Sequence, residues 1–226
     1  WADARAGSLA ESFPYKLQSK YFNFYYGDDV NNIDVIYRVA DGFIDIVDRD
    51  FFKVRFDFPL DVYVLENAEA FRDFLRHKLG MLNTVGLYGV YLEQIHGFVT
   101  YENAGFGTFS HEIMHPLLRA DFPRLPEWAV EGIPAFFEKF FGYWQDNRPV
   151  LKFGFQNPWR IRELGARLGS LDLEHILNHP GQHDTSEKRM VSVFLYQKGK
   201  LRRYLDLART DDRKGYRTLV EAAFEK

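Results

Sequence analysis

The chain has 226 residues, 46% of them hydrophobic and 27% charged, which suffices for the core of one ordinary globular domain spanning residues 1–226. A formal net charge of −3 gives no basic surface of the kind that binds nucleic acid, so we expect no nucleic-acid partner. The absence of cysteine excludes disulfides, thiol catalysis and cysteine-ligated metals, and no apolar stretch of about 18 residues predicts a transmembrane helix.

Strand and helix signals alternate in the first part of the sequence. Runs of β-favouring residues predict strands, and apolar residues at helical spacing predict helices. In chain order we expect a strand over residues 17–26, a helix over 30–52, a strand over 60–65, a helix over 68–79 capped by Asn67, and a hairpin of 86–91 with 98–101.

From Thr108 onward the sequence is mainly helical in character, and the aromatic residues over 136–144 have the spacing typical of a buried helix. The predicted fold class is therefore α+β, with a small strand-rich N-terminal half (15–105) and a mainly helical half (106–226). The strand at 98–101 is expected to offer a free edge to which an extended peptide could add as a further strand.

The most informative segment is His111-Glu112-Ile113-Met114-His115, which has the spacing H-E-x-x-H. On a helix, residues i and i+4 lie on one face, so His111 and His115 can reach a single metal ion. Glu112 lies beside that ion without ligating it, where it can take a proton from a water molecule. The segment predicts a zinc hydrolase whose general base is Glu112. We expect Ser110 or Thr108 to cap its helix.

A catalytic zinc usually takes three protein ligands, so a third is needed. Asp121 lies six residues beyond His115 and is expected in a loop. Glu127 and Glu131 lie four apart on the next predicted helix, where the helix dipole alone accounts for an acidic residue in the first turn, at Glu127. Glu131 lies one turn further in and is followed by Gly132, which lets another backbone come close.

The run Trp128-Ala129-Val130-Glu131-Gly132-Ile133-Pro134-Ala135-Phe136-Phe137-Glu138 resembles the W-x-x-E-G-x-A-x-[YF]-x-E helix of the gluzincin metallopeptidases, which include the bacterial peptidase MA-like proteins. The resemblance covers roughly residues 15–205, and the two motifs are its most specific part. It implies that Glu131 is the third zinc ligand beside His111 and His115. It also implies a peptide or protein substrate.

The sequence departs from the family pattern in three places. Pro116 and Pro134 fall inside the two motif helices, where proline removes a backbone hydrogen bond and tends to kink the helix. The family also supplies a Tyr or His from its C-terminal half to stabilise the oxyanion, and Thr185 stands where we would place the Tyr. His183 and Tyr196 are the candidates for that catalytic role, although Tyr196 is also explained as a core aromatic.

Two further sets of polar residues have more than one interpretation. Glu138 matches the last Glu of the family motif, and it is either an acceptor for a ligand histidine or an ordinary surface residue. His175, His179 and His183 are spaced four apart, but Pro180 and Gly181 end the helix before His183. The three histidines therefore cannot share a helical face, and we expect no second metal site.

We expect a zinc-dependent metallopeptidase with Zn²⁺ as its cofactor. The alternatives are a binding module of the same fold that has lost turnover, and a zinc hydrolase acting on a non-peptide amide or ester. The chain begins at Trp1 rather than Met, so we expect that an N-terminal segment has been removed. The resemblance implies a secreted or periplasmic protein. Such proteins include ones anchored to the membrane through an N-terminal segment. The oligomeric state is left open.

Overall fold

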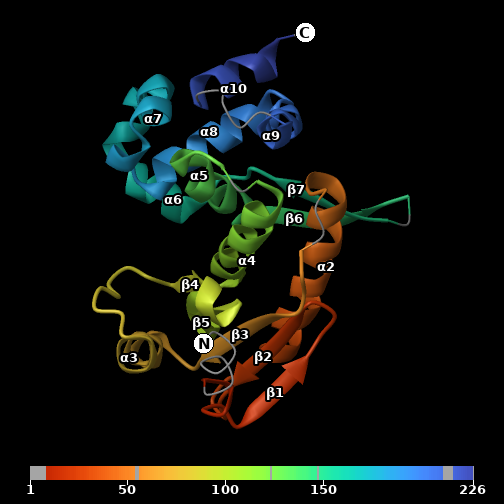
Figure 1. Cartoon of the computed structure of the whole chain (residues 1–226), viewed down its shortest axis with the longest axis vertical. Coiled ribbons are helices and arrows are strands. Elements are labelled where there is room, and N and C mark those ends of the chain that lie inside the picture. The colour runs from red at the N-terminus through yellow and green to blue at the C-terminus, as the bar shows by residue number, and fades with distance from the viewer. Residues whose placement is uncertain (1–8, 54–55, 123, 147, 211–215, 226) are drawn as a thin grey trace. The chain divides into compact units, whose positions relative to one another are not determined.

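The protein combines a sheet near its N-terminus with a mainly helical C-terminal half, so the predicted α+β class is confirmed (Figure 1). The structure is a computed structural model, and it describes residues 9–53, 56–122, 124–146, 148–210 and 216–225.

The chain divides into two compact units, and neither is one continuous stretch of sequence. The first comprises Trp1–Asp45 and Phe56–Pro116, and the second comprises Ile46–Arg55 and Leu117–Lys226.

A mixed five-stranded sheet with the order β1-β2-β3-β5-β4 organises the first unit. Strand β3 is central and runs parallel to both β2 and β5, whereas β1 and β4 are antiparallel edge strands. The prediction of a free edge at 98–101 is wrong, because β5 lies between β3 and β4, and the edge belongs to β4. The strands are β1 (Tyr15–Gln18), β2 (Phe22–Tyr26), β3 (Leu60–Leu65), β4 (Gly89–Leu92) and β5 (Gly97–Tyr101).

The single strand predicted over 17–26 is instead the hairpin of β1 and β2. The chain reverses at Ser19, whose backbone N–H donates to the carbonyl of Phe22 at 2.8 Å. The Ser19 hydroxyl also lies 2.9 Å from Asp41 Oδ1, and the backbone N–H of Lys20 donates to Asp41 Oδ2 at 3.2 Å. A carboxylate from a distant helix therefore holds a turn that contains neither Gly nor Pro.

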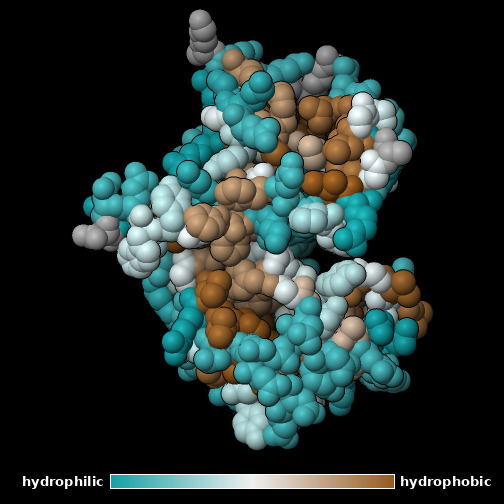
Figure 2. Space-filling model, turned by 180° about the vertical axis from the view of Figure 1, so that it is seen from behind, coloured by the Kyte–Doolittle hydropathy of each residue, from teal (hydrophilic) through white to brown (hydrophobic). Residues whose placement is uncertain are grey.

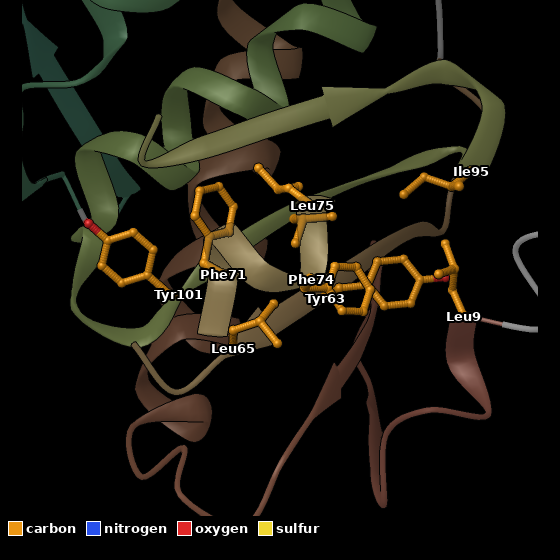
Figure 3. Close-up of a cluster of buried hydrophobic side chains, with 9 residues drawn as sticks. Leu9, Tyr63, Leu65, Phe71, Phe74, Leu75, Ile95 and Tyr101 are labelled. Carbon is orange, nitrogen blue, oxygen red and sulfur yellow. The ribbon is translucent and has the colours of Figure 1, made fainter. Parts of the chain in front are cut away.

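The helix over 68–79 and its Asn67 cap are confirmed as helix α3 (Ala68–Leu79). The Asn67 side chain accepts from the backbone N–H groups of the first turn, at 2.9 and 3.0 Å. Helix α3 covers one face of the sheet, and its apolar residues pack there on side chains of β3 and β5 (Figure 3). The buried cluster on this face comprises Leu9, Tyr63, Leu65, Phe71, Phe74, Leu75, Ile95, Val99 and Tyr101.

The opposite face of the sheet receives helix α4 (Phe106–Asp121). Phe109 packs against Phe22, Phe24 and Phe98, with ring centroids 4.9–6.0 Å apart. These three residues alternate with the residues facing α3, as the two-residue period of a strand requires. The rings therefore fix which side of α4 is turned toward the sheet.

Helix α4 begins earlier than predicted, so neither Thr108 nor Ser110 is its cap. Gly105, at φ 84°, turns the chain into the helix. The hydroxyls of Thr108 and Ser110 then donate to the carbonyls of Ala104 and Gly107, each at 3.0 Å. The predicted helix over 30–52 is α2 (Ile33–Phe51), and its two ends belong to different units.

The second unit is mainly helical. Among the described residues, no helix of either unit is long and apolar enough to cross a membrane. The α-helices that lie wholly in the second unit are α5 (Glu127–Phe137), α6 (Pro158–Leu164), α7 (Leu173–Asn178), α8 (Thr185–Gln197), α9 (Leu201–Thr210) and α10 (Tyr216–Phe224).

The prediction of one buried helix over 136–144 is wrong, because α5 ends at Phe137. Residues Phe140–Gln145 form strand β6, which pairs antiparallel with β7 (Arg148–Phe153). Phe153 anchors the hairpin by packing on Phe136 and Phe137, with ring centroids 5.9 and 4.7 Å away. The outer part of this hairpin is exposed to solvent, and Trp144 in β6 is 75% accessible. Apolar side chains also reach the protein surface elsewhere, as the brown patches among teal residues show (Figure 2).

Candidate metal centre

The two motif histidines lie one turn apart on α4. The ring centroids of His111 and His115 are 5.0 Å apart, with an angle of 73° between the ring planes. His111 is buried and His115 is half-buried. Helix α4 continues through Pro116, so the proline does not break it at the site. The helix therefore holds two partly desolvated imidazoles side by side, as the H-E-x-x-H spacing predicts.

Glu112 is fixed by the edge strand β4. The backbone N–H of Tyr91 donates to Glu112 Oε2 at 2.8 Å, and the side chain is only 8% exposed. The approach is close because β4 has Gly89 at this point. A Cβ at Gly89 would lie 2.8 Å from both Glu112 Cγ and Thr108 Cγ2. Neither β4 residue was predicted to belong to the site, although a Gly inside a strand is a signal for close approach.

Glu131 lies on α5, which also continues through its proline, Pro134. The expectation that Gly132 admits another backbone is confirmed. A Cβ on Gly132 would lie 2.4 Å from the carbonyl oxygen of Lys188 on α8 and 2.7 Å from its carbonyl carbon. The glycine next to Glu131 thus lets α5 and α8 pack at backbone distance, and this contact fixes the part of α5 that carries Glu131.

His111, His115 and Glu131 form a group that could hold a metal ion, since one ligand atom of each lies within 4.8 Å of the others. Two imidazoles and one carboxylate are a donor set found at catalytic zinc sites. The residues present therefore fit a zinc ion by their chemistry and by their mutual distances. The group is the one that the H-E-x-x-H and W-x-x-E-G motifs select.

The two other acidic candidates have different partners. Asp121 is buried at the end of α4, not in a loop, and accepts from Arg209 Nε and Nη2 at 2.9 and 2.6 Å. It also accepts from the backbone N–H of Lys53 at 3.1 Å. Glu127 is exposed in the first turn of α5, where Lys188 Nζ lies 3.0 Å from its carboxylate. Structural ion pairs account for both residues.

Glu138 is not an ordinary surface residue. It is buried beyond the end of α5, where it pairs with Arg160 Nη2 and accepts from Arg160 Nε at 3.0 Å and from Asn157 Nδ2 at 2.9 Å. Burial by itself lowers the pKa of Arg160, but the hydrogen bonds and negative charge of Glu138 outweigh this and raise it. The arginine is therefore charged, and the pair ties the end of α5 to α6.

The two candidate oxyanion residues lie on or next to α8. Tyr196 is half-buried, and its ring packs against Phe136 with the centroids 4.9 Å apart. His183 directly precedes the Asp184 cap of α8, and its Nε2 lies 2.7 Å from His175 Nδ1. These contacts do not bear on an oxyanion role, which stays a prediction for both residues.

The sequence matches no protein-family model, and no curated protein is significantly similar to it.

Proposed function

We propose that the chain is a zinc-dependent metallopeptidase that hydrolyses peptide bonds. The observation that carries the proposal is the convergence of His111, His115 and Glu131 around one position, with Glu112 between the two histidines. Helical geometry alone would bring the histidines together, but it would not bring Glu131, which is 16 residues further along the chain. The gluzincin-like motifs independently select the same three residues.

Zinc bound by these residues would act as a Lewis acid toward the substrate carbonyl and would make water more acidic. Glu112 is the residue that moves the proton. Its carboxylate accepts a proton from the attacking water and delivers it to the leaving amine nitrogen, so the base is regenerated after each peptide bond is cleaved. The N–H of Tyr91 donates to Oε2, and this hydrogen bond orients the carboxylate.

An extended peptide suits this arrangement because β4 is an edge strand. A substrate backbone could add to that edge by main-chain hydrogen bonds. The same strand donates Tyr91 N–H to the base, so substrate binding and orientation of Glu112 would share one element. His183 and Tyr196 remain the candidates for the second oxyanion donor. Loss of such a donor lowers kcat by about 10²–10³-fold.

Metal content and peptide cleavage together test the proposal. We expect at least one zinc per chain by elemental analysis, and cleavage of a peptide library by the zinc-loaded protein. Glu112→Gln should retain the full zinc content and lose cleavage, since it keeps the shape of the side chain but cannot accept the proton. Glu131→Ala should bind one zinc fewer per chain. Glu127→Gln, four residues earlier on the same helix, is the matched control and should lose neither.

Other results would assign the chain to a different class. Zinc binding without cleavage of any peptide, amide or ester would indicate a binding module that has kept the site. Cleavage of esters or non-peptide amides alone would indicate a hydrolase of another specificity. Undiminished peptide cleavage by Glu112→Gln would show that the assigned base is wrong.

A further inference from the structure

A second group of histidines lies in the second unit, outside the site described above. His175 is on α7 and His179 follows its last residue, while His183 comes after a 3-10 turn at Pro180–Gln182. As predicted, the helix ends before His183, so the three histidines share no helical face. The turn folds the chain back, and His183 Nε2 lies 2.7 Å from His175 Nδ1. Histidines that cannot share a helical face thus meet across a turn.

The relative position of His175 and His183 closely reproduces that of the two motif histidines. Their ring centroids are 4.9 Å apart with 78° between the ring planes, against 5.0 Å and 73° for His111 and His115. Two nitrogen ligands at about 2.0–2.1 Å from one metal ion are separated by only a few ångströms. The facing nitrogens of His175 and His183 lie 2.7 Å apart, which is hydrogen-bond distance, so the two rings need only separate slightly to admit an ion between them.

The second nitrogen of His183 faces a carboxylate. Nδ1 is buried and lies 3.2 Å from Glu187 Oε2, which is ion-pair distance without the geometry of a hydrogen bond. Glu187 is itself fixed, because it completes the capping box of α8 with Asp184, and Arg167 Nη1 lies 3.3 Å from its Oε1. A carboxylate beside Nδ1 favours the tautomer protonated there, and this directs the lone pair of Nε2 toward His175.

His179 carries the next imidazole. Its ring centroid lies 4.7 Å from that of His175, and both residues are exposed, but the rings must turn before one nitrogen of each can reach one ion. Three imidazoles without a thiolate suit late first-row divalent ions such as zinc, copper and nickel. We propose that His175, His183 and His179 bind one such ion, as a second metal site that ties α7 to the start of α8.

The site is tested by titrating Cu²⁺ into the chelator-treated His115→Gln variant, in which the motif site has lost a ligand. This background makes the result independent of the proposed peptidase function. We expect one saturable Cu²⁺ per chain, with an electron paramagnetic resonance spectrum showing coupling to more than one imidazole nitrogen. Adding His183→Gln or His175→Gln should weaken binding at least about tenfold and remove that coupling.

A matched control is His77→Gln, which removes a lone exposed histidine from α3 and should leave the titration unchanged. The His175 change is on the surface, so it gives the same test if the His183 variant fails to fold by circular dichroism. Absence of saturable Cu²⁺ binding, or equal binding after both changes, would overturn the proposal and leave only a histidine–histidine hydrogen bond. Unchanged affinity in His179→Gln would refute its assignment as third ligand.

Discussion

Replacing Gly132 by alanine should destabilise the protein, although alanine is the better helix former. The new Cβ would lie 2.4 Å from the carbonyl oxygen of Lys188. Carbon–oxygen contacts of this kind are ordinarily about 3.3–3.6 Å, so α5 and α8 would have to separate by roughly 1 Å. The Cβ would be attached to the backbone of α5, and the atoms it meets belong to the backbone of α8, so no flexible side chain can move aside.

The magnitude follows from two opposing effects. Overpacking a close contact costs about 1–3 kcal/mol, and a rigid backbone contact belongs near the upper end of that range. Removing a glycine from a helix interior returns up to about 1 kcal/mol. The net loss is therefore about 2 kcal/mol, which corresponds to a Tm roughly 4–8 °C lower for a chain of this size.

Gly42→Ala is the matched control, since Gly42 lies inside α2 and a Cβ there would meet nothing within 4 Å. The same substitution should raise Tm by about 2–4 °C, because only the helix propensity changes. Thermal unfolding followed by circular dichroism measures both variants. If Gly132→Ala raised Tm as Gly42→Ala does, the close packing of α5 on α8 described above would be refuted.

Three further results are expected. Asp121→Ala should lower the free energy of unfolding by about 3 kcal/mol in a denaturant titration, because it leaves the mostly buried Arg209 without its carboxylate partner. Asp45→Ala removes an exposed ion pair and should lower it by less than about 1 kcal/mol. Equal losses in the two variants would contradict this reasoning. Burial raises the pKa of Tyr63, so the folded state keeps its proton where the unfolded chain loses it, and stability falls as pH rises above 10. Tyr63→Phe should remove about 1.4 kcal/mol of that fall by pH 11; an unchanged pH profile would show otherwise. Gly89→Ala should displace Glu112 and reduce peptide cleavage without loss of zinc; full activity would mean that β4 does not position the base.

Local signals predicted much of the fold. The strand at 60–65 and the helix at 68–79 with its Asn67 cap are as expected, because each is set by a short apolar pattern and one capping side chain. The strand predicted at 17–26 is a hairpin, because the alternation of residues is the same on both sides of a turn that Asp41 stabilises from 22 residues away. Aromatic residues at 140–145 fit a helix or a strand, and pairing with β7 decides between them.

The candidate metal site was predictable as far as it is encoded in side-chain spacing. The H-E-x-x-H spacing selects His111 and His115, the resemblance to the gluzincin helix implies Glu131, and the structure brings their ligand atoms together. The hydrogen bond from Tyr91 to Glu112 was not predictable, since a backbone N–H carries no residue-type signal. The contact of His175 with His183 is not predictable from the sequence either, because Pro180 and Gly181 signal the end of a helix but not the direction in which the chain then turns.

The interleaving of the two units along the sequence has a consequence for synthesis on the ribosome. Phe51 emerges early, yet its ring partners in the second unit are Phe137 and Phe153, at centroid distances of 5.2 and 5.7 Å. At about 5–20 residues per second, this end of α2 waits roughly 4–20 s for them. During that interval its apolar surface is available to a chaperone or to another nascent chain. Slowing translation after residue 55 should therefore favour aggregation more than the same pause placed after residue 153.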